Sequence, residues 1–342
     1  MPVVKPTQKI RVGVFGVGKF GTYHLENWLA IPEVTVVGFC DIDPQKQKEI
    51  PKKYHIPSYT HDELIDLCDL ADIVVPTISH YEIAKKALLA GKHAFVEKPF
   101  TETLAQAEEL ISLTNSDKGP FLTVGFIERF NPIFRKVLKS FHLKPVFIES
   151  HRLGQFNPFR GTDVPVVMEL LIHDIDILLH IVRSPVSGIR ASGSPVLSPR
   201  TDIVNARVEF ENGTVANLTS SRISPKKMRK MRFFQPSGYA SIDFMNQSAD
   251  LYQLEESSKT IAKDSERIMV NIPKDFEKGF RYQKLTADKE NALQTELREF
   301  ARTCAEGTPP VVSGMDGYQA LKLAIDIQNA VMAHYNKYSS DR

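Results

Sequence analysis

The fold is decided by one stretch near the N-terminus, Ile10-Arg11-Val12-Gly13-Val14-Phe15-Gly16-Val17-Gly18-Lys19-Phe20-Gly21. Its first half is a mostly apolar, β-branched run that predicts a buried strand, and a helical pattern follows over residues 19–29. In a dinucleotide-binding βαβ unit, Gly16 permits the tight turn, Gly18 lets the backbone approach a pyrophosphate, and Gly21 lets the helix lie close to the strand. The stretch therefore predicts such a unit, against the alternative of a glycine-rich turn without a ligand.

An acidic residue stands where such a unit recognises the ribose of its ligand. Asp41 lies twenty residues after Gly21, directly behind a second apolar run over 34–40. A carboxylate at this place accepts hydrogen bonds from ribose hydroxyls and repels a 2′-phosphate. We therefore expect NAD, rather than NADP, as the cofactor.

The composition is that of a large enzyme with small-molecule partners. The 342 residues exceed what one core usually fills, so two domains are expected. Lys and Arg number 43 against 41 Asp and Glu, which leaves no excess charge to bind nucleic acid or an acidic membrane surface. Neither a secretion signal nor a spanning apolar run is found, so we expect a cytoplasmic protein. The cysteines lack a C-x-x-C spacing and predict reduced thiols rather than disulfides or a zinc site: Cys40, Cys68 and Cys304.

Strands and helices alternate along the first third of the chain, as in a parallel sheet with crossover helices. Strands are predicted over 10–15, 34–40, 72–76, 93–96 and 121–124, and helices over 19–30, 43–53, 61–68, 80–90 and 101–115. Later strands are predicted over 145–151, 202–210, 214–221, 228–234, 239–244 and 249–254, and closing helices over 287–306 and 314–335. We therefore predict an α/β Rossmann domain with a parallel sheet over 1–125. An α+β domain with an open, mostly antiparallel sheet, for substrate binding and oligomerisation, is predicted over 126–342.

A lysine follows the strand over 93–96, in the motif Glu97-Lys98-Pro99. Ligands of parallel sheets bind at the carboxyl ends of the strands, so Lys98 is expected to point toward the same crevice as the glycine turn. A proline after it can take the cis isomer, which would fix the direction of the ammonium group. The alternative is a surface lysine before a turn proline.

The helix predicted near 165–182 carries four titratable residues among Leu, Ile and Val. Glu169, His173, Asp176 and His180 follow one another in steps of four, three and four, which places them on one helical face. Such a stripe on an apolar helix indicates the lining of a cleft. The alternatives are a satisfied core histidine, a solvated stripe, or a metal site at Glu169 and His173, which no H-E-x-x-H motif supports.

Taken together, these motifs resemble the Gfo/Idh/MocA oxidoreductases, relatives of glucose-fructose oxidoreductase and inositol dehydrogenase. The resemblance rests on the glycine turn with Asp41, on Glu97-Lys98-Pro99, on Gly125-Phe126-Ile127-Glu128-Arg129-Phe130-Asn131-Pro132, on the helix over 169–176, and on Ser313-Gly314-Met315-Asp316-Gly317. It implies a Rossmann domain joined to an open, mostly antiparallel sheet, NAD as cofactor, and a homo-oligomer, dimer or tetramer, formed sheet against sheet.

The resemblance also assigns residues. It places the family's catalytic lysine at Lys98 and its catalytic histidine at His173, with Glu169 where many members have an aspartate. Cofactor contacts are expected from Gly16, Gly18, Lys19, Phe20, Asp41, Pro76, His80, Glu97 and Lys98. Substrate contacts are expected from Lys98, Arg129, Asn131, Arg152, Glu169 and His173.

Within the family, four segments look most like the branch that oxidises the C3 hydroxyl of UDP-N-acetylglucosamine on the way to amino sugars of the lipid A type. They are the Glu-Arg-Phe-Asn-Pro segment, Thr162-Asp163-Val164, His173-Asp174-Ile175-Asp176, and the stretch over 221–232. Phe126 and Glu169 depart from this branch, which has histidine and aspartate there. A dehydrogenase of a free sugar or polyol such as inositol, and a non-catalytic NAD or sugar sensor, are the alternatives.

The chemistry of alcohol oxidation is consistent with these residues. A neutral imidazole, with an ordinary pKa of about 6.5, can remove the hydroxyl proton, which makes His173 the candidate base. The ammonium of Lys98 would stabilise the charge that grows on the oxygen, and Glu169 would orient the imidazole or hold a neighbouring hydroxyl. The basic run over 226–232 has two interpretations, a solvated or subunit-contact face and a contact with substrate phosphates.

Overall fold

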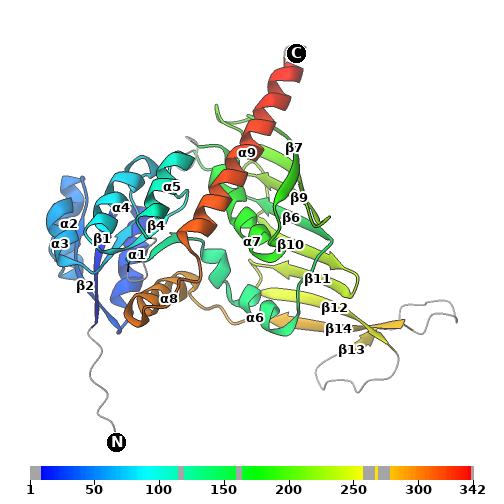
Figure 1. Ribbon diagram of the computed structural model, residues 1–342, viewed down its shortest axis with the longest axis horizontal. Coiled ribbons are helices and arrows are strands. Elements are labelled where there is room, and N and C mark those ends of the chain that lie inside the picture. Colours follow the sequence, from blue (N-terminus) through cyan, green and yellow to red (C-terminus); the bar gives the residue numbers. More distant parts are fainter. Residues whose placement is uncertain (1–8, 115–118, 159–163, 257–265, 269–277, 340–342) are drawn as a thin grey trace, which may run out of the picture. The chain divides into compact units, whose positions relative to one another are not determined.

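The computed structural model of the chain (Figure 1) describes residues 9–114, 119–158, 164–256, 266–268 and 278–339. The chain forms two compact units. The first unit consists of residues 1–130 and 291–321, and the second of residues 131–290 and 322–342. Residues 291–321, which the sequence analysis placed with the C-terminal domain, thus group with the N-terminal part of the chain.

The first unit is built on a five-stranded parallel sheet with the strand order β2-β1-β3-β4-β5. Its strands are β1 Ile10–Phe15, β2 Val34–Cys40, β3 Leu70–Ile73, β4 His93–Glu97 and β5 Leu122–Gly125. The order steps outward in both directions from β1, as in a doubly wound sheet. The predicted Rossmann architecture is confirmed.

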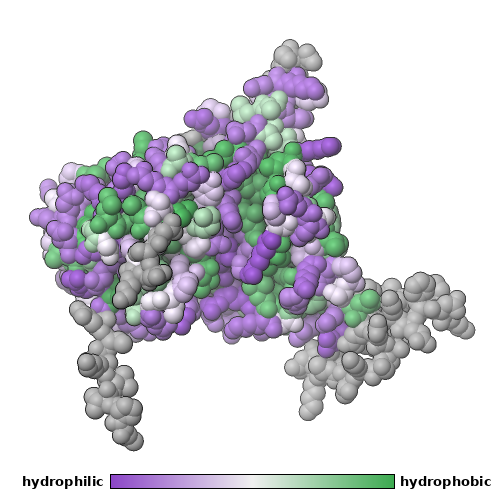
Figure 2. Space-filling model, viewed as in Figure 1, coloured by the Kyte–Doolittle hydropathy of each residue, from purple (hydrophilic) through white to green (hydrophobic). Residues whose placement is uncertain are grey.

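Four helices of the first unit begin at a side-chain cap, namely those that follow Asp43, Thr60, Thr103 and Asn291. Its helical elements are α1 Lys19–Leu29, α2 Pro44–Tyr54, α3 His61–Leu67, η1 Thr77–Ser79, α4 His80–Leu89, α5 Leu104–Ser112, η2 Ile127–Phe130, α8 Ala292–Glu306 and the start of α9 Gly314–Ser339. Helix α5 begins later than predicted because Thr103 and Gln106 form a capping box there. Figure 2 shows mainly hydrophilic residues over α2 and α3, and α2 buries a single residue, Ile50.

Helix α8 belongs to the first unit because it completes the core there. Leu297 and Phe300 pack in one cluster with Leu25 and Trp28 of α1 and with Phe39 of β2. The side chain of Asn291, which caps α8, also donates a hydrogen bond to Asn27 at 2.6 Å. A segment far along the chain therefore completes the core on the α1 side of the parallel sheet.

The second unit is built on a nine-stranded sheet with the order β13-β14-β12-β11-β10-β6-β9-β8-β7. Its strands are β6 Phe147–Leu153, β7 Val186–Ser194, β8 Ile203–Phe210, β9 Val215–Ser221, β10 Met228–Gln235, β11 Gly238–Asp243, β12 Ser248–Glu256, β13 Glu266–Ile268 and β14 Lys278–Thr286. All neighbours pair antiparallel except β6 and β9, which are parallel. The predicted open, mostly antiparallel sheet is confirmed.

Helices lie on one face of this sheet (Figure 1). They are α6 Pro132–Ser140 and α7 Ile172–Val182, the latter preceded by a π-helical turn, η3 Val167–Leu171. Helix α6 contacts β11, β12 and β14, and η3 contacts β9. The opposite face carries the alternate residues of each strand, because side chains of a strand point to opposite sides in turn.

An aromatic row crosses this opposite face. Phe147, Phe234, Tyr239, Tyr252 and Tyr282 stand opposite one another on β6, β10, β11, β12 and β14, with successive ring centroids 5.5, 4.9, 5.6 and 5.0 Å apart. All five are partly exposed, whereas Ile148, Phe233, Ala240 and Leu251, next to the first four in their strands, are buried. Cross-strand aromatic pairs of this kind stabilise a sheet.

Several elements differ from the sequence-based prediction. Strand β3 ends at Ile73 rather than residue 76, because the chain turns at Pro76 into η1. Strand β7 was not predicted, since its sequence Val-Ser-Gly-Ile-Arg-Ala-Ser-Gly-Ser is poor in strand-forming residues. Helix α6 and strand β14 were also missed. None of the helices among the described residues is long and apolar enough to cross a membrane.

Candidate functional site

The glycine turn of the first unit leaves an open approach to the start of α1. Gly16 has φ +89°, and a Cβ there would lie 2.9 Å from the carbonyl oxygen of Val74. A Cβ on Gly21 would lie 1.9 Å from the carbonyl oxygen of Gly16. Gly18 is the N-cap of α1, and a Cβ there would meet nothing within 4 Å. Two glycines are thus required for packing, while the third borders free space at a helix N-terminus, which fits the pyrophosphate of NAD.

Asp41 is held next to this turn by backbone donors. Its Oδ2 accepts a hydrogen bond from the amide of Val17 at 2.6 Å, and its Oδ1 accepts one from the amide of Asp43 at 2.9 Å. The carboxylate is therefore fixed beside the glycine turn and remains partly exposed. Each carboxylate oxygen has a further lone pair, so the group can still accept a ribose hydroxyl.

The other predicted cofactor residues differ in exposure. Lys19, Phe20 and Pro76 are exposed, as a ligand contact requires. His80 is buried instead, with Nδ1 3.0 Å from the carbonyl oxygen of Pro99 and Nε2 2.9 Å from that of Val75. Burial lowers the pKa of His80, although these carbonyl contacts oppose the shift. His80 thus links the loop after β3 to the turn after β4, and its contact with cofactor stays a prediction.

Lys98 follows β4 and is partly exposed. Its peptide bond to Pro99 is cis, the isomer that the sequence analysis considered. The amide of Lys98 donates to Oε2 of Glu97 at 3.1 Å, and Glu97 itself is 8 % exposed. The main chain at Lys98 is thereby attached to a buried carboxylate.

A buried network that the sequence analysis missed lies behind Glu97. His24 of α1 is fully buried, with Nδ1 3.1 Å from both carboxylate oxygens of Asp72 and Nε2 3.3 Å from Oε1 of Glu97. Trp28 donates its indole N–H to Asp72 at 2.8 Å. The signal in the sequence was a histidine at a helical step from Trp28, on the face of α1 that must pack on the sheet.

In the second unit, the predicted helix begins with the π turn over 167–171. Glu169 and His173 are partly exposed, whereas Asp176 is 1 % exposed, so the predicted stripe of four does not share one environment. The extra residue of a π turn rotates the side chains before it relative to those after it, and such turns are frequent at functional sites. His180 packs edge-on against Phe134, with ring centroids 6.4 Å apart.

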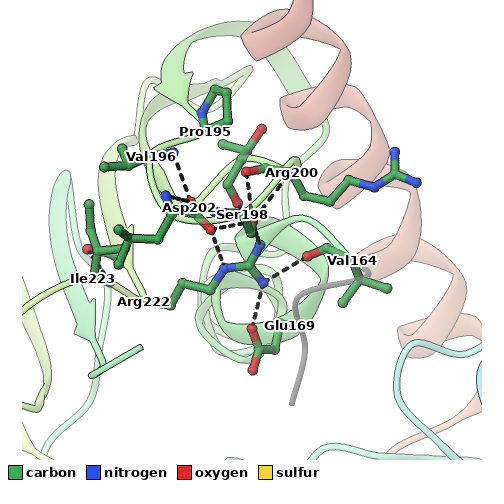
Figure 3. Close-up of polar contacts among 12 residues, drawn as sticks. Val164, Glu169, Pro195, Val196, Ser198, Arg200, Asp202, Arg222 and Ile223 are labelled. Carbon is green, nitrogen blue, oxygen red and sulfur yellow. Dashed lines mark hydrogen bonds and ion pairs between the residues drawn. The ribbon is translucent and has the colours of Figure 1, made fainter. Parts of the chain in front are cut away.

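Glu169 is held by Arg222, which directly follows β9 (Figure 3). The guanidinium Nη1 donates to Oε2 of Glu169 at 3.0 Å and to the carbonyl oxygen of Val164, and Nε donates to Asp202 at 2.7 Å. The Arg222 side chain is only 4 % exposed. Thr162 and Asp163, part of a segment that carries the resemblance, lie outside the described residues.

Asp202 anchors this arginine in turn (Figure 3). Its Oδ2 accepts the backbone amides of Val196, Leu197 and Ser198, at 2.8, 2.7 and 2.8 Å. Burial opposes the charge, but these hydrogen bonds and Arg222 hold the pKa of Asp202 well below its usual range. The loop between β7 and β8 is therefore connected through Asp202 and Arg222 to Glu169 in one cluster.

Three predicted substrate residues are buried in contacts of their own unit. Arg129 is 5 % exposed, and its Nη2 lies 3.3 Å from Oδ1 of Asp316. Arg152 is 2 % exposed, and its Nη2 lies 2.6 Å from Oδ1 of Asp174. Asn131 is 7 % exposed and caps α6, since its Oδ1 accepts the amide of Ile133. These contacts are structural, and substrate contact by these residues stays a prediction. Across the described ranges, no group of three or more His, Cys, Asp or Glu side chains is arranged to hold a metal ion.

Gly18 and Gly21 differ in their surroundings, so alanine substitutions at these two positions give a matched test. We predict that Gly21→Ala lowers the free energy of unfolding by about 3 kcal/mol, because its methyl group overlaps a backbone oxygen. Gly18→Ala should keep the stability of the parent protein and weaken NADH binding about tenfold, because its methyl group obstructs the helix N-terminus. Urea unfolding and calorimetric titration with NADH measure the two effects. Equal NADH affinity in Gly18→Ala and the parent protein would contradict this assignment.

The Arg222 cluster gives a second test. Arg222→Met leaves two partly or fully buried carboxylates without their guanidinium, so we predict a loss of about 3 kcal/mol or more in stability. Arg207→Met on β8 is the control, since Arg207 pairs with Glu209 while 45 % exposed and should cost less than about 1 kcal/mol. Chemical denaturation compares both variants, and similar losses would speak against a special role of the cluster.

Comparison with known proteins agrees with this architecture. Residues 10–126 match the model of the oxidoreductase family with an NAD-binding Rossmann fold, and residues 151–239 match the GFO/IDH/MocA C-terminal domain. The chain is 30% identical over 325 residues to UDP-N-acetylglucosamine 3-dehydrogenase of Acidithiobacillus ferrooxidans, covering 95% of this chain and 98% of that protein. A solved structure of that enzyme superposes with a TM-score of 0.84 at the same coverage.

Relatives with other substrates are also similar along most of their length. Scyllo-inositol 2-dehydrogenase (NAD(+)) of Bacillus subtilis is 25% identical over 342 residues, covering 94% of each chain. Scyllo-inositol dehydrogenase of Lactobacillus casei, solved with NAD(H) and scyllo-inositol, shares the fold with a TM-score of 0.75 at 18% identity, covering 96% of this chain and 98% of that one. The chain belongs to the Gfo/Idh/MocA family and is an NAD-dependent oxidoreductase.

Proposed function

We propose that the protein oxidises the C3 hydroxyl of a nucleotide sugar, UDP-N-acetylglucosamine, to the 3-keto form with NAD as the oxidant. The observation that carries the proposal is the match to UDP-N-acetylglucosamine 3-dehydrogenase, which extends over 95% of this chain and 98% of that enzyme. The 3-keto sugar would then accept an amino group, as the making of amino sugars of the lipid A type requires.

In the proposed reaction, His173 is the general base. It lies just after the π turn, is partly exposed, and has its Nδ1 buried. We therefore assign the proton transfer to Nε2, which takes the hydroxyl proton of the sugar. Such proton transfer by a positioned imidazole contributes about 10²- to 10⁴-fold to the rate.

Lys98 and Glu169 have supporting roles in the proposal. The ammonium of Lys98 stabilises the negative charge that develops on the sugar oxygen as the proton leaves. Glu169, fixed by Arg222 at 3.0 Å, holds a neighbouring hydroxyl of the sugar or orients His173. A carboxylate fixed in this way needs no reorganisation when the substrate binds.

The first unit supplies the cofactor site. The turn at Gly16, Gly18 and Gly21 would hold the pyrophosphate at the start of α1, and Asp41 would bind the ribose hydroxyls. NAD, when bound, accepts the hydride from the carbon that bears the reacting hydroxyl. A 2′-phosphate would be repelled by Asp41, which favours NAD over NADP.

A free polyol such as inositol is the second candidate substrate. The inositol dehydrogenase of Bacillus subtilis matches 94% of this chain, although at 25% identity. The basic run over 226–232 supports a diphosphate substrate only weakly. Lys230 pairs with Asp243 at 3.2 Å and Arg232 with Glu149 at 3.2 Å, so both already have partners on the sheet.

We further propose that the chain forms a homo-oligomer through the sheet face that carries the aromatic row. Five partly exposed aromatic side chains on five strands make a continuous apolar stripe, and such stripes are typical of protein interfaces. The ion pairs of Lys230 and Arg232 border this stripe on β10 and fit the polar rim of an interface.

A substrate panel tests the proposed reaction. We expect NADH absorbance to appear with UDP-N-acetylglucosamine and NAD, and more strongly when an amine-transferring partner enzyme removes the ketone. Free N-acetylglucosamine, glucose and inositol should give little signal under the same conditions. Turnover of inositol without turnover of any UDP-sugar would favour the second candidate.

Two variants test the catalytic roles. We predict that Lys98→Ala and His173→Ala each lower turnover by about 10²-fold or more, because each removes a group that acts on the reacting hydroxyl. NADH binding should remain close to that of the parent protein. Lys139→Ala and His142→Ala, at exposed positions of the second unit, are the controls. Full activity of both catalytic-site variants would exclude the mechanism.

The aromatic row gives a prediction on assembly. Tyr239→Lys together with Tyr252→Lys should shift the protein toward monomers in light scattering after size exclusion, because two charges would be buried in the interface. Tyr338→Lys, at an exposed position near the end of α9, should leave the mass unchanged. An unaltered oligomer in the double variant would place the interface elsewhere.

A further inference from the structure

The buried imidazole of His24 connects helix α1 to the ends of strands β3 and β4. His24 has no exposed surface, and its two ring nitrogens contact different strands of the sheet. On one side lies Asp72 of β3, with both carboxylate oxygens 3.1 Å from Nδ1. On the other side lies Glu97 of β4, with Oε1 3.3 Å from Nε2.

The geometry decides the protonation of this ring. A neutral imidazole carries one N–H and one lone pair, and here the lone pair would face a carboxylate oxygen in a site without exposed surface. Only the imidazolium can present a hydrogen to both carboxylates. The rings of Phe20 and Phe95 pack edge-on against it with centroids 5.0 and 5.6 Å away.

The charges around the ring support the same conclusion. Burial by itself lowers the pKa of His24, but the carboxylates of Asp72 and Glu97 together raise it to about 10. Trp28 donates a further hydrogen bond to Asp72 at 2.8 Å, which helps to hold that carboxylate beside the ring. The Nε2 contact with Glu97 has the distance of an ion pair without the direction of a good hydrogen bond, so its contribution is mainly electrostatic.

Glu97 transmits this interaction to the turn. Its Oε2 accepts the amide hydrogen of Lys98 at 3.1 Å, while its Oε1 faces His24. The carboxylate also occupies the space beside Gly125 of β5, where a Cβ would lie 2.5 Å from Oε1. The Glu97 side chain is thus confined by an imidazolium, by a main-chain donor and by a glycine.

We propose that His24 is a positioning residue that stays charged throughout the working pH range and fixes Glu97, and through Glu97 the main chain of Lys98. The side chain of Lys98, which carries the ammonium group, then extends from a main chain whose position is fixed. The part that concerns Lys98 rests on the proposed function, whereas the charge of His24 does not.

The charge is tested by ¹⁵N solid-state NMR of the full chain labelled at histidine, at pH 8.5. We expect one histidine with two protonated ring nitrogens, whose signals vanish in His24→Gln and persist in His93→Gln. His93 of β4 is the contrast, because its Nδ1 accepts the amide of Phe121 at 2.9 Å and must be unprotonated there. If the signals that vanish in His24→Gln are those of a neutral ring, the proposal is wrong.

The positioning role is tested by a double-mutant cycle of His24→Gln and Lys98→Ala. His24→Gln alone should lower kcat about 10- to 100-fold at saturating NAD and substrate, as a misplacement near 1 Å does, and change the dissociation constant of NADH less than about threefold. In protein that already carries Lys98→Ala, adding His24→Gln should lower kcat by less than about threefold. A merely structural role would instead weaken NADH binding, and equal losses in both backgrounds would overturn the proposal.

A second variant covers the case that His24→Gln does not fold. Gly125→Ala keeps every charge and displaces mainly the Glu97 carboxylate, with the ring of Phe95 the next group in its way at 3.2 Å, so it should lower kcat while the doubly protonated histidine signal persists. Full activity of Gly125→Ala would contradict the role of Glu97. Full activity of Lys98→Ala would refute the proposed mechanism instead, and the NMR result on His24 would stand independently.

Discussion

The first unit depends on one steric contact, the close approach of Gly21 to the carbonyl oxygen of Gly16. A Cβ at Gly21 would lie 1.9 Å from that oxygen, so α1 can lie against the end of β1 only with glycine there. This packing also determines which residues of α1 face the sheet. His24 and Trp28 follow at helical steps and both reach Asp72 of β3. The pyrophosphate turn and the buried ion network are therefore two results of the same helix placement.

The second unit depends on the neutralisation of buried charge. Arg222 joins Asp202 to Glu169, and Asp202 fixes three backbone amides of the loop that follows β7. Removing one charged residue of such a cluster leaves an uncompensated buried charge. The resulting loss of stability is larger than the stability that the intact pair contributes. The side chain of Glu169 is thus placed by long-range contacts, and the π turn that carries it is stabilised from outside its own helix.

Most elements with a strong apolar pattern were predicted from the sequence, whereas β7 and α6 were missed. The β1 and α1 elements and the partner strand β2 followed from apolar runs and glycine spacing. Strand β7 was missed because Ser and Gly dominate it, and α6 was missed although Asn131 and Pro132 are ordinary start signals of a helix.

Charged residues were harder to interpret than elements. Arg129 and Arg152 were predicted to contact substrate, which stays a prediction, and both are buried beside acidic residues of their own unit. Their partners lie 187 and 22 residues away along the chain, and no local pattern reveals such pairings. The same limit applies to His24, whose partner Asp72 is 48 residues away. A sequence indicates which side chains are ionisable, whereas the fold decides which of them are already neutralised.

The buried charged groups are divided between the two units, and this division bears on how one fold can serve different substrates. The groups that fix the main chain of Lys98 all belong to the first unit, and they contact strands and helices rather than a sugar. On the proposed function, substrate choice depends on the second unit. There, Arg222 binds the side chain of Glu169 at 3.0 Å. Moving this carboxylate toward another sugar would leave the buried guanidinium with one contact fewer. The position of Glu169 is therefore coupled to Arg222, so on the proposed function a change of substrate at this site involves both residues.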